Sequence, residues 1–117
     1  MTKKPETVKQ EDLIKRETVR DDEIYENEED GLVYDDENTQ NPFTGTANKF
    51  HKNSQLMLRG NFIKGLAEGL WERYHDNGQL SFRTNYKNGK REGLHEEYSK
   101  KNQLLLRENY KTGKLVE

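Results

Sequence analysis

Hydrophobic and polar positions alternate along three segments in the C-terminal two thirds of the chain. In the middle segment the apolar positions are Leu80, Phe82, Thr84 and Tyr86, and the polar positions are Gln79, Ser81, Arg83, Asn85 and Lys87. The same parity separates Leu56, Leu58 and Phe62 from Gln55, Arg59 and Asn61, and Leu104, Leu106 and Tyr110 from Gln103, Arg107 and Asn109. This alternation predicts β-strands with one buried face and one face in water.

The alternating segments belong to a repeat of 24 residues that runs three times from Gly45 to Val116. Six columns are identical in all copies: Gly45, Gly69, Gly93; Gln55, Gln79, Gln103; Leu56, Leu80, Leu104; Arg59, Arg83, Arg107; Asn61, Asn85, Asn109; and Gly65, Gly89, Gly113. Two columns are always aromatic: Phe50, Tyr74, Tyr98 and Phe62, Tyr86, Tyr110. Such agreement predicts units that bury their apolar faces on their neighbours. We therefore expect both aromatic columns to lie on the apolar side and to serve the structure.

Asparagine and glycine punctuate each repeat. Asn77-Gly78 and Asn88-Gly89 lie between strand-like segments, and such dipeptides supply the positive φ angles that tight hairpin turns require. Each copy is therefore predicted to be one antiparallel hairpin, joined to the next by another turn, and the fold class is all-β.

The pairing of the two strands in a hairpin can be tested by arithmetic. Tyr74 shares a face with Leu80 and Phe82 only if the hairpin contains a three-residue loop or a β-bulge. On that register Trp71 would lie opposite Arg83 on the wet face. The first strand does not alternate cleanly, so the side of the sheet that Trp71 occupies stays open.

The N-terminal part of the chain divides in two. Residues 1–20 are expected to be disordered or loosely ordered, with residues 13–19 as a short edge strand or a helical turn. Residues 21–44 place small apolar clusters on both sides of Asp30-Gly31 among many acids. They predict an irregular hairpin, followed by a lead-in turn at Pro42, that caps the open end of the repeats with charge. Residues 45–117 then form the three repeats.

Charge is distributed unevenly along the chain. Of the 117 residues, 29% are hydrophobic and 36% charged, so the core must be thin. Residues 1–44 contain 6 Lys and Arg against 14 Asp and Glu, whereas residues 45–117 contain 14 against 8. This asymmetry favours an acidic tail or an electrostatic partner for the basic half. One hypothesis is that the acidic segment folds over the basic face and shields it.

Several classes of chemistry are absent from the sequence. There is no cysteine, which excludes disulfides and thiolate sites and leaves the redox compartment open. No apolar run approaches the length of a membrane span, and none follows Lys3 and Lys4 as in a signal peptide. Localisation therefore has two interpretations: cytoplasmic if Met1 is the native start, and exported or cell-surface if a signal peptide has been removed.

The repeat columns resemble a known family. Residues 69–80, Gly-Leu-Trp-Glu-Arg-Tyr-His-Asp-Asn-Gly-Gln-Leu, and residues 85–93 look like the variant form of the MORN repeat, and Pro-Phe-Thr-Gly at 42–45 is similar to what precedes such repeats in bacterial members. The departures are Ser54 at the turn glycine, Phe62-Ile63-Lys64-Gly65 at the second turn, and Lys101-Asn102 in copy three. The resemblance implies an elongated, twisted antiparallel sheet of successive hairpins that serves as a binding scaffold rather than a catalyst.

The arginine column is the candidate binding site. Arg59, Arg83 and Arg107 would recur about every 10 Å on one face, a spacing that suits an acidic protein segment, lipid head groups or a sulfated glycan. Trp71 is grouped with them as a partner-binding residue. The alternative is that each arginine pairs across strands with Glu72, Glu96 or Glu108 and only solubilises the sheet. The asparagine column is expected to support the turns.

Other sites are weaker. His51 and His75 share one column and His95 another, so their predicted separation is too large for one metal ion, and we expect no metal or cofactor. The sequence shows no recognisable acid-base pair, catalytic triad or phosphate loop, so an enzyme is not expected. Nucleic acid is an improbable partner, because the aromatic columns should be core and the N-terminal third is acidic.

These observations favour a non-catalytic repeat scaffold for protein or surface binding, as an exported adhesion or interaction module. Two alternatives are a cytoplasmic antitoxin-like regulatory protein and a module that binds membrane lipids through its basic face. Self-association through sheet edges is a further expectation.

Overall fold

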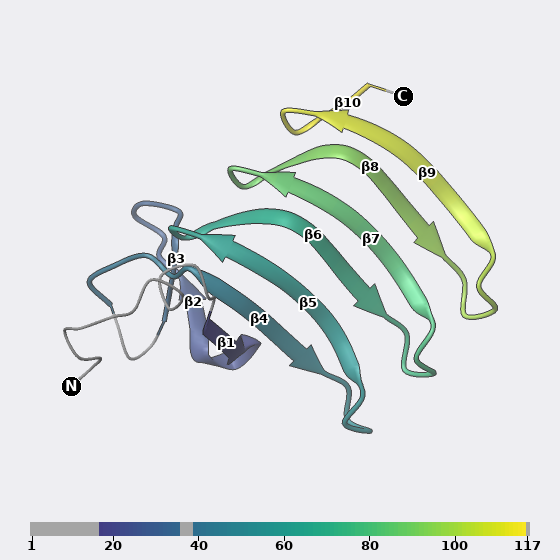
Figure 1. Ribbon diagram of the computed structural model, residues 1–117, viewed down its shortest axis with the longest axis horizontal. Coiled ribbons are helices and arrows are strands. Elements are labelled where there is room, and N and C mark those ends of the chain that lie inside the picture. Colours follow the sequence, from purple (N-terminus) through teal and green to yellow (C-terminus); the bar gives the residue numbers. More distant parts are fainter. Residues whose placement is uncertain (1–16, 36–38, 117) are drawn as a thin grey trace.

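The fold is an open, curved sheet of consecutive hairpins (Figure 1). The computed structural model describes residues 17–35 and 39–116. Its strands are β1 (Glu17–Arg20), β2 (Ile24–Glu26), β3 (Val33–Asp35), β4 (Gly45–Phe50), β5 (Leu56–Ile63), β6 (Leu66–Tyr74), β7 (Leu80–Lys87), β8 (Lys90–Tyr98), β9 (Leu104–Lys111) and β10 (Lys114–Leu115), with a short 3-10 helix, η1 (Asp21–Glu23), between β1 and β2.

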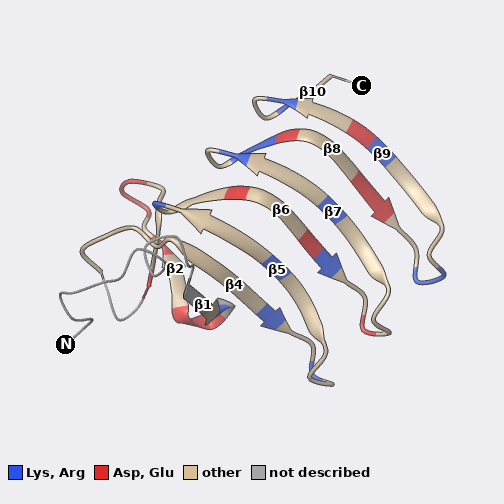
Figure 2. Cartoon of the chain, in the orientation of Figure 1, with Lys and Arg blue, Asp and Glu red and all other residues tan. Residues whose placement is uncertain are grey.

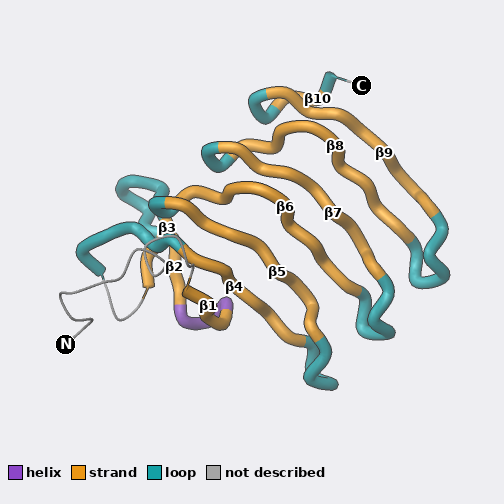
Figure 3. Tube along the Cα trace, viewed as in Figure 1, coloured by secondary structure: helices purple, strands orange, loops and turns teal. Residues whose placement is uncertain are grey.

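The main sheet has the order β1-β4-β5-β6-β7-β8-β9-β10. From β4 onward every strand pairs antiparallel with the next one in the chain, while β1 pairs parallel with β4. The connecting turns gather at the two ends of the strands, as Figure 3 shows. The all-β prediction of successive antiparallel hairpins is thus confirmed.

The N-terminal part lies against the first repeat. The edge of β4 is paired with β1, whereas β2 and β3 form a separate two-stranded sheet. Two backbone hydrogen bonds anchor β3, Val33 N–H to Gly65 C=O (3.0 Å) and Phe43 N–H to Val33 C=O (2.8 Å), and Gly65 N–H to Phe43 C=O (2.8 Å) joins their partners. Of the expected loosely ordered segment 1–20, residues 1–16 lie outside the described part of the chain, and residues 17–20 form β1.

Two kinds of turn alternate along the array. The β5–β6, β7–β8 and β9–β10 turns have two consecutive residues with positive φ: Lys64-Gly65, Asn88-Gly89 and Thr112-Gly113. At the opposite end of the strands, single left-handed residues occur at Ser54 (φ 73°), Gly78 (φ 88°) and Asn102 (φ 64°). The first and third copies therefore keep the left-handed conformation of the second, although residues other than glycine carry it.

Bulges set the register within each hairpin. Arg73 pairs with Phe82 while Tyr74 pairs with Leu80, so β7 contains one extra residue at this step. The predicted bulge is confirmed, but it does not place Tyr74 on the same face as Phe82. The register of Trp71 opposite Arg83 is wrong: Trp71 lies opposite Thr84, because the bulge falls between Trp71 and the turn.

One side of the sheet, the aromatic face, carries Phe62, Trp71, Tyr86, His95 and Tyr110. The Trp71 ring makes edge contacts with Phe62 and Tyr86, at centroid distances of 5.1 and 5.8 Å. Its indole N–H donates to the Asn61 carbonyl oxygen over 3.2 Å. The indole lies directly over Gly60, where any Cβ would overlap with the ring. Trp71 therefore packs on the aromatic face, which answers the question of its side that the sequence left open.

The two aromatic columns lie on opposite faces, contrary to the expectation that both are core. Phe62, Tyr86 and Tyr110 belong to the aromatic face. Tyr98 points to the other face, where its hydroxyl donates to Glu96 (3.0 Å). Phe50 is exposed there beneath the guanidinium of Arg20, 5.3 Å from the ring centroid. Tyr74 occupies the same repeat position as Tyr98, and it pairs with Leu80.

His95 occupies the centre of the C-terminal part of the aromatic face. Its ring lies between Phe82 and Tyr110, at centroid distances of 5.7 and 6.1 Å, and is 2% exposed. Nε2 donates to a carboxylate oxygen of Glu97 over 2.9 Å, while Nδ1 is buried without a hydrogen-bond partner. His95 therefore replaces the Trp71 ring in the next repeat, rather than lying on the surface as expected.

Candidate functional site

The candidate site is a row of polar residues that crosses the sheet on the face opposite the aromatic rings. The strand registers place its members directly opposite one another: Arg20, Asn48, Arg59, Glu72, Arg83, Glu96 and Arg107. Residues opposite one another on neighbouring strands lie on the same face. We call this side of the sheet the arginine face. In Figure 2 the blue bands on β5, β7 and β9 alternate with red bands on β6 and β8.

Glu96 is the most tightly bound member of the row. Its carboxylate is 2% exposed and accepts from Arg83 Nε (2.9 Å), from Arg107 Nε (2.9 Å) and Nη2 (2.7 Å), and from the Tyr98 hydroxyl (3.0 Å). The guanidinium-bearing side chains are 47% and 60% exposed. One buried carboxylate thus bridges two arginines of neighbouring repeats.

The electrostatics follow from this geometry. The hydrogen bond from Arg83 lowers the pKa of Glu96 below its ordinary value of 4.5, and the bonds from Arg107 and Tyr98 add to this effect against the opposing cost of burial. The Arg83 pKa is raised in turn by the same carboxylate. Because both shifts favour the charged forms, this part of the row is an ionised network at neutral pH.

The N-terminal end of the row is different. Arg59 lies between Asn48 and Glu72, so it has an amide on one side where Arg83 has a second carboxylate. Its Nε donates to the Asn48 side-chain oxygen over 3.4 Å. Partial burial raises the pKa of Tyr74, and the neighbouring Glu72 raises it further.

Apolar side chains lie beside the row. Leu70 follows Gly69 in β6, and Leu94 follows Gly93 in β8. The two leucines are 42% and 37% exposed. Together with Arg83, Asn85 and Glu96 they line an open depression of about 310 Å³. The column pattern did not identify these leucines, although the Gly-Leu pairs at 69–70 and 93–94 are visible in the sequence.

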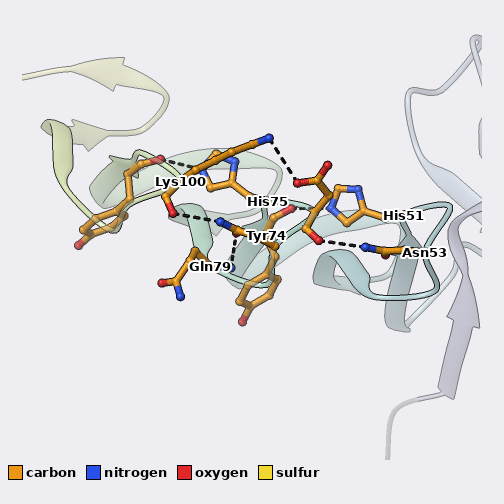
Figure 4. Close-up of polar contacts among 9 residues, drawn as sticks. His51, Asn53, Tyr74, His75, Gln79 and Lys100 are labelled. Carbon is orange, nitrogen blue, oxygen red and sulfur yellow. Dashed lines mark hydrogen bonds and ion pairs between the residues drawn. The ribbon is translucent and has the colours of Figure 1, made fainter.

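Side chains at one end of the strands join successive hairpins (Figure 4). His51 Nε2 donates to the Tyr74 carbonyl oxygen (2.8 Å), and His75 Nε2 does the same to the Tyr98 carbonyl oxygen (2.9 Å). Asn53 and Asn77 donate likewise to the carbonyl oxygens at 76 and 100, over 2.9 and 3.1 Å. These histidines therefore have a structural role between repeats.

The opposite end of the strands has its own connections. Carboxylates of Glu68 and Glu92 accept from the backbone N–H of Asn88 (3.0 Å) and Thr112 (2.8 Å). Thr44 accepts from Lys64 N–H in the same way (2.8 Å). Each hairpin is thus bound to the next at both of its ends, which fixes the arginine face between them.

The predicted binding residues divide between the two faces. Arg59, Arg83 and Arg107 share the arginine face, while Trp71 packs on the other face against Phe62 and Tyr86. Of the asparagine column, Asn85 lines the depression, and Asn61 accepts from the Thr46 hydroxyl (2.6 Å). The sequence therefore found the arginine row but not the leucines that border it.

Two searches of the described residues gave no candidates. No group of His, Asp and Glu side chains in residues 17–35 and 39–116 is arranged to hold a metal ion. In the same part of the chain, no helix has the length and hydrophobicity needed to cross a membrane.

Fold and site together define a repeat protein made of stacked hairpins, with a polar row running perpendicular to its strands. The family model described as MORN repeat variant matches residues 67–88, which cover β6 from its second residue, the following turn and β7. Repeats of this kind are generally non-catalytic binding modules. No curated protein and no solved structure matches the chain.

Proposed function

We propose that this chain is a non-catalytic scaffold that binds a protein partner across its arginine face. The observation that carries the proposal is the open depression lined by Leu70, Leu94 and Arg83. Two exposed leucines beside ordered arginines and tyrosines give the mixture of apolar contact and directed hydrogen bonding found at protein interfaces. The hairpin connections hold these groups in place, which lowers the entropic cost of binding.

A protein partner is favoured over lipid head groups, glycans or other anionic surfaces. Glu96 already binds the guanidinium groups of Arg83 and Arg107, so a polyanion would have to compete with a buried carboxylate. A protein can instead place apolar side chains on Leu70 and Leu94 and supply both donors and acceptors to the alternating row. Export, adhesion and antitoxin-like regulation stay predictions from the sequence.

The test begins with a photo-crosslinking amino acid at position 94, which captures the molecule that contacts the depression. The captured protein is then purified and titrated by calorimetry against the chain and against the double variant Leu70→Ser/Leu94→Ser. We expect affinity to fall at least about tenfold, since each leucine contributes on the order of 1 kcal/mol or more when covered.

The matched control is Leu115→Ser, which removes an exposed leucine on β10. It should leave the affinity unchanged, and all variants should melt within a few degrees of the parent. The proposal fails if the double variant binds as tightly as the parent, or if acidic vesicles bind the chain with an affinity that Leu70→Ser/Leu94→Ser does not alter.

A further inference from the structure

Arg59 differs from the other two arginines of its column because it binds no carboxylate. Arg83 and Arg107 both donate to Glu96, over 2.9 and 2.7 Å. Arg59 is exposed, and although Glu72 lies opposite it, Arg59 forms no ion pair within residues 17–35 and 39–116. The bond from its Nε to the Asn48 side-chain oxygen is 3.4 Å, which is long for an N–H···O contact. The charge of Arg59 is therefore free to bind a ligand.

Asn48 occupies the position in the row that Glu96 fills two repeats later. Each of the two residues lies between a pair of arginines on the neighbouring strands: Arg83 and Arg107 beside Glu96, and Arg20 and Arg59 beside Asn48. Figure 2 shows red bands on β6 and β8 but none on β4. An asparagine amide can donate to an anion, but it cannot neutralise two guanidinium groups. This end of the row therefore lacks the negative charge that Glu96 supplies further along.

Arg20 contributes to this end of the row from β1. Its side chain is 63% exposed, and its guanidinium lies over the Phe50 ring, 5.3 Å from the centroid. Asp22 approaches the Arg20 Nε to 3.7 Å, but both members of this pair are exposed, and such pairs are weak. The Glu23 carboxylate accepts from the Arg20 backbone N–H over 2.8 Å. The Arg20 guanidinium therefore remains a donor for an anion above Asn48.

A single carboxylate is long enough in reach to join two such arginines. Residues two strands apart in a sheet are separated by about 10 Å at the backbone. Glu96 nevertheless accepts from both Arg83 and Arg107, because both guanidinium groups reach the middle strand. A carboxylate placed above Asn48 from solvent would meet the same pair of groups, with the Asn48 N–H₂ group as a further donor.

We propose that Arg20, Asn48 and Arg59 form a carboxylate site, which binds an aspartate or glutamate side chain of the protein partner. The inference rests on the proposed function and deepens it by naming a chemical group of that partner. The bound carboxylate takes the place in the row that Glu96 takes in the third repeat. Asp22 lies close enough to Arg20 to disfavour a doubly charged phosphate more than a singly charged carboxylate.

The carboxylate site and the depression are neighbours on the arginine face. Leu70 lies two residues before Glu72 in β6, so both side chains point to the same face, and Glu72 is opposite Arg59 on β5. Only one strand therefore separates Leu70 from the strand that carries Arg59. A partner whose apolar side chains cover the depression can place an acidic side chain on the carboxylate site at the same time.

Acetate is the probe for the site itself, and the NMR signals of the arginine Nε–H groups are the measurement. When chloride is exchanged for acetate at pH 7 and constant ionic strength, the Arg20 and Arg59 signals should shift with half-saturation on the order of 0.1 M, as expected for exposed charge-assisted contacts. Arg83 and Arg107 already bind Glu96 and should shift little. Arg73, which is exposed opposite Phe82 on the aromatic face, is the matched control and should not shift. Inorganic phosphate should bind more weakly than acetate.

Two substitutions at position 48 test where the carboxylate lies. Asn48→Glu supplies the carboxylate from the protein itself and should abolish the acetate shift of Arg59, whereas the neutral Asn48→Gln should keep it. Asn48→Glu should also melt about 3 °C above Asn48→Gln at pH 7, as expected for a weak exposed ion pair. In an Arg59→Gln background this difference in Tm should fall by at least half.

The last experiment uses the protein captured through position 94. In calorimetry Arg59→Gln should weaken its binding about fivefold, Asn48→Glu should weaken it at least as much, and Arg73→Gln should leave it unchanged. The inference is overturned if acetate shifts Arg59 and Arg73 alike, if phosphate binds more tightly than acetate, or if the partner binds Arg59→Gln as tightly as the parent. If no protein is captured, the proposed function fails together with the partner's carboxylate, whereas the acetate titration still decides whether Arg59 binds a carboxylate.

Discussion

Replacing Glu96 by glutamine tests whether the charge row stabilises the sheet. The substitution keeps the size of the side chain and one acceptor oxygen, but it removes the negative charge that Arg83, Arg107 and Tyr98 share. It also introduces an amide N–H₂ group facing two guanidinium groups. The variant therefore isolates the electrostatic contribution with little change in packing.

The expected loss can be worked from the contacts. A hydrogen bond to a charged group is worth about 1.5–3 kcal/mol when buried, but Arg83 and Arg107 are about half exposed and recover hydration when the carboxylate is lost. We therefore assign about 1 kcal/mol to each arginine and expect Glu96→Gln to lower the unfolding free energy by about 2 kcal/mol. For a chain of this size that corresponds to roughly 10 °C in Tm.

The pH dependence carries the sign of the pKa shift. Because the folded pKa of Glu96 is lowered, its contribution is fully present above the ordinary value of 4.5 and is lost as pH falls through the folded pKa. The difference in stability between the parent and Glu96→Gln should therefore be constant from pH 8 to about 5.5. It should shrink progressively below about pH 4.5.

Urea unfolding followed by tryptophan fluorescence measures both quantities, since Trp71 is the single tryptophan of the chain. Glu72→Gln provides the matched control: it changes the same column, but Glu72 is more exposed than Glu96. We expect the control to cost under half as much. The reasoning is refuted if the two variants are equally stable, or if the loss at position 96 is the same at pH 7 and at pH 4.

Two further substitutions test the packing of the array. Gly60→Ala should lower stability by about 3 kcal/mol, because its Cβ overlaps with the Trp71 indole; the same change in a Trp71→Ala background should cost much less, and equal losses in both backgrounds would exclude the clash. His75→Ala should cost about 1 kcal/mol in thermal or urea unfolding through loss of its bond to the Tyr98 carbonyl. Lys52→Ala is its control, and an equal effect of the two would show that the bond between hairpins contributes nothing.

The architecture could be predicted from the sequence because its signal is repeated three times. A single Asn-Gly dipeptide is a weak hairpin signal, but the same turn positions at a fixed offset, each followed by an alternating strand, leave few other folds. The parallel pairing of β1 could not be predicted, because four residues at one sheet edge carry no periodic pattern.

The faces of the strands were harder to predict than the strands themselves. Alternation gives the correct side for Phe82 and Tyr86 but fails across a bulge, where one extra residue reverses the relation between the two strands. Tyr74 and Trp71 lie on either side of that step, so Tyr74 was assigned to the wrong face and the face of Trp71 stayed open. The packing of Trp71 depends on Gly60, whose missing side chain leaves room for the indole.

The candidate site was predicted in part for a similar reason. Arginine is invariant in its column and was therefore found, but its acidic partners vary: the column of Glu72 and Glu96 begins with Asn48. Sequence reasoning left the pairing of the arginines open, and the register settles which acid lies opposite each one. The hydrogen bonds between hairpins had a signal in the sequence, the histidine shared by positions 51 and 75. It is not a full column, because the third copy has Ser99 at that position.

That substitution changes where the side chain bonds. Each histidine donates forward, to a carbonyl oxygen 23 residues later in the next hairpin. The Ser99 hydroxyl oxygen instead accepts from the backbone N–H of Lys101 and Gln103 inside its own turn, over 3.1 and 3.2 Å. The third hairpin is therefore self-contained at its turn.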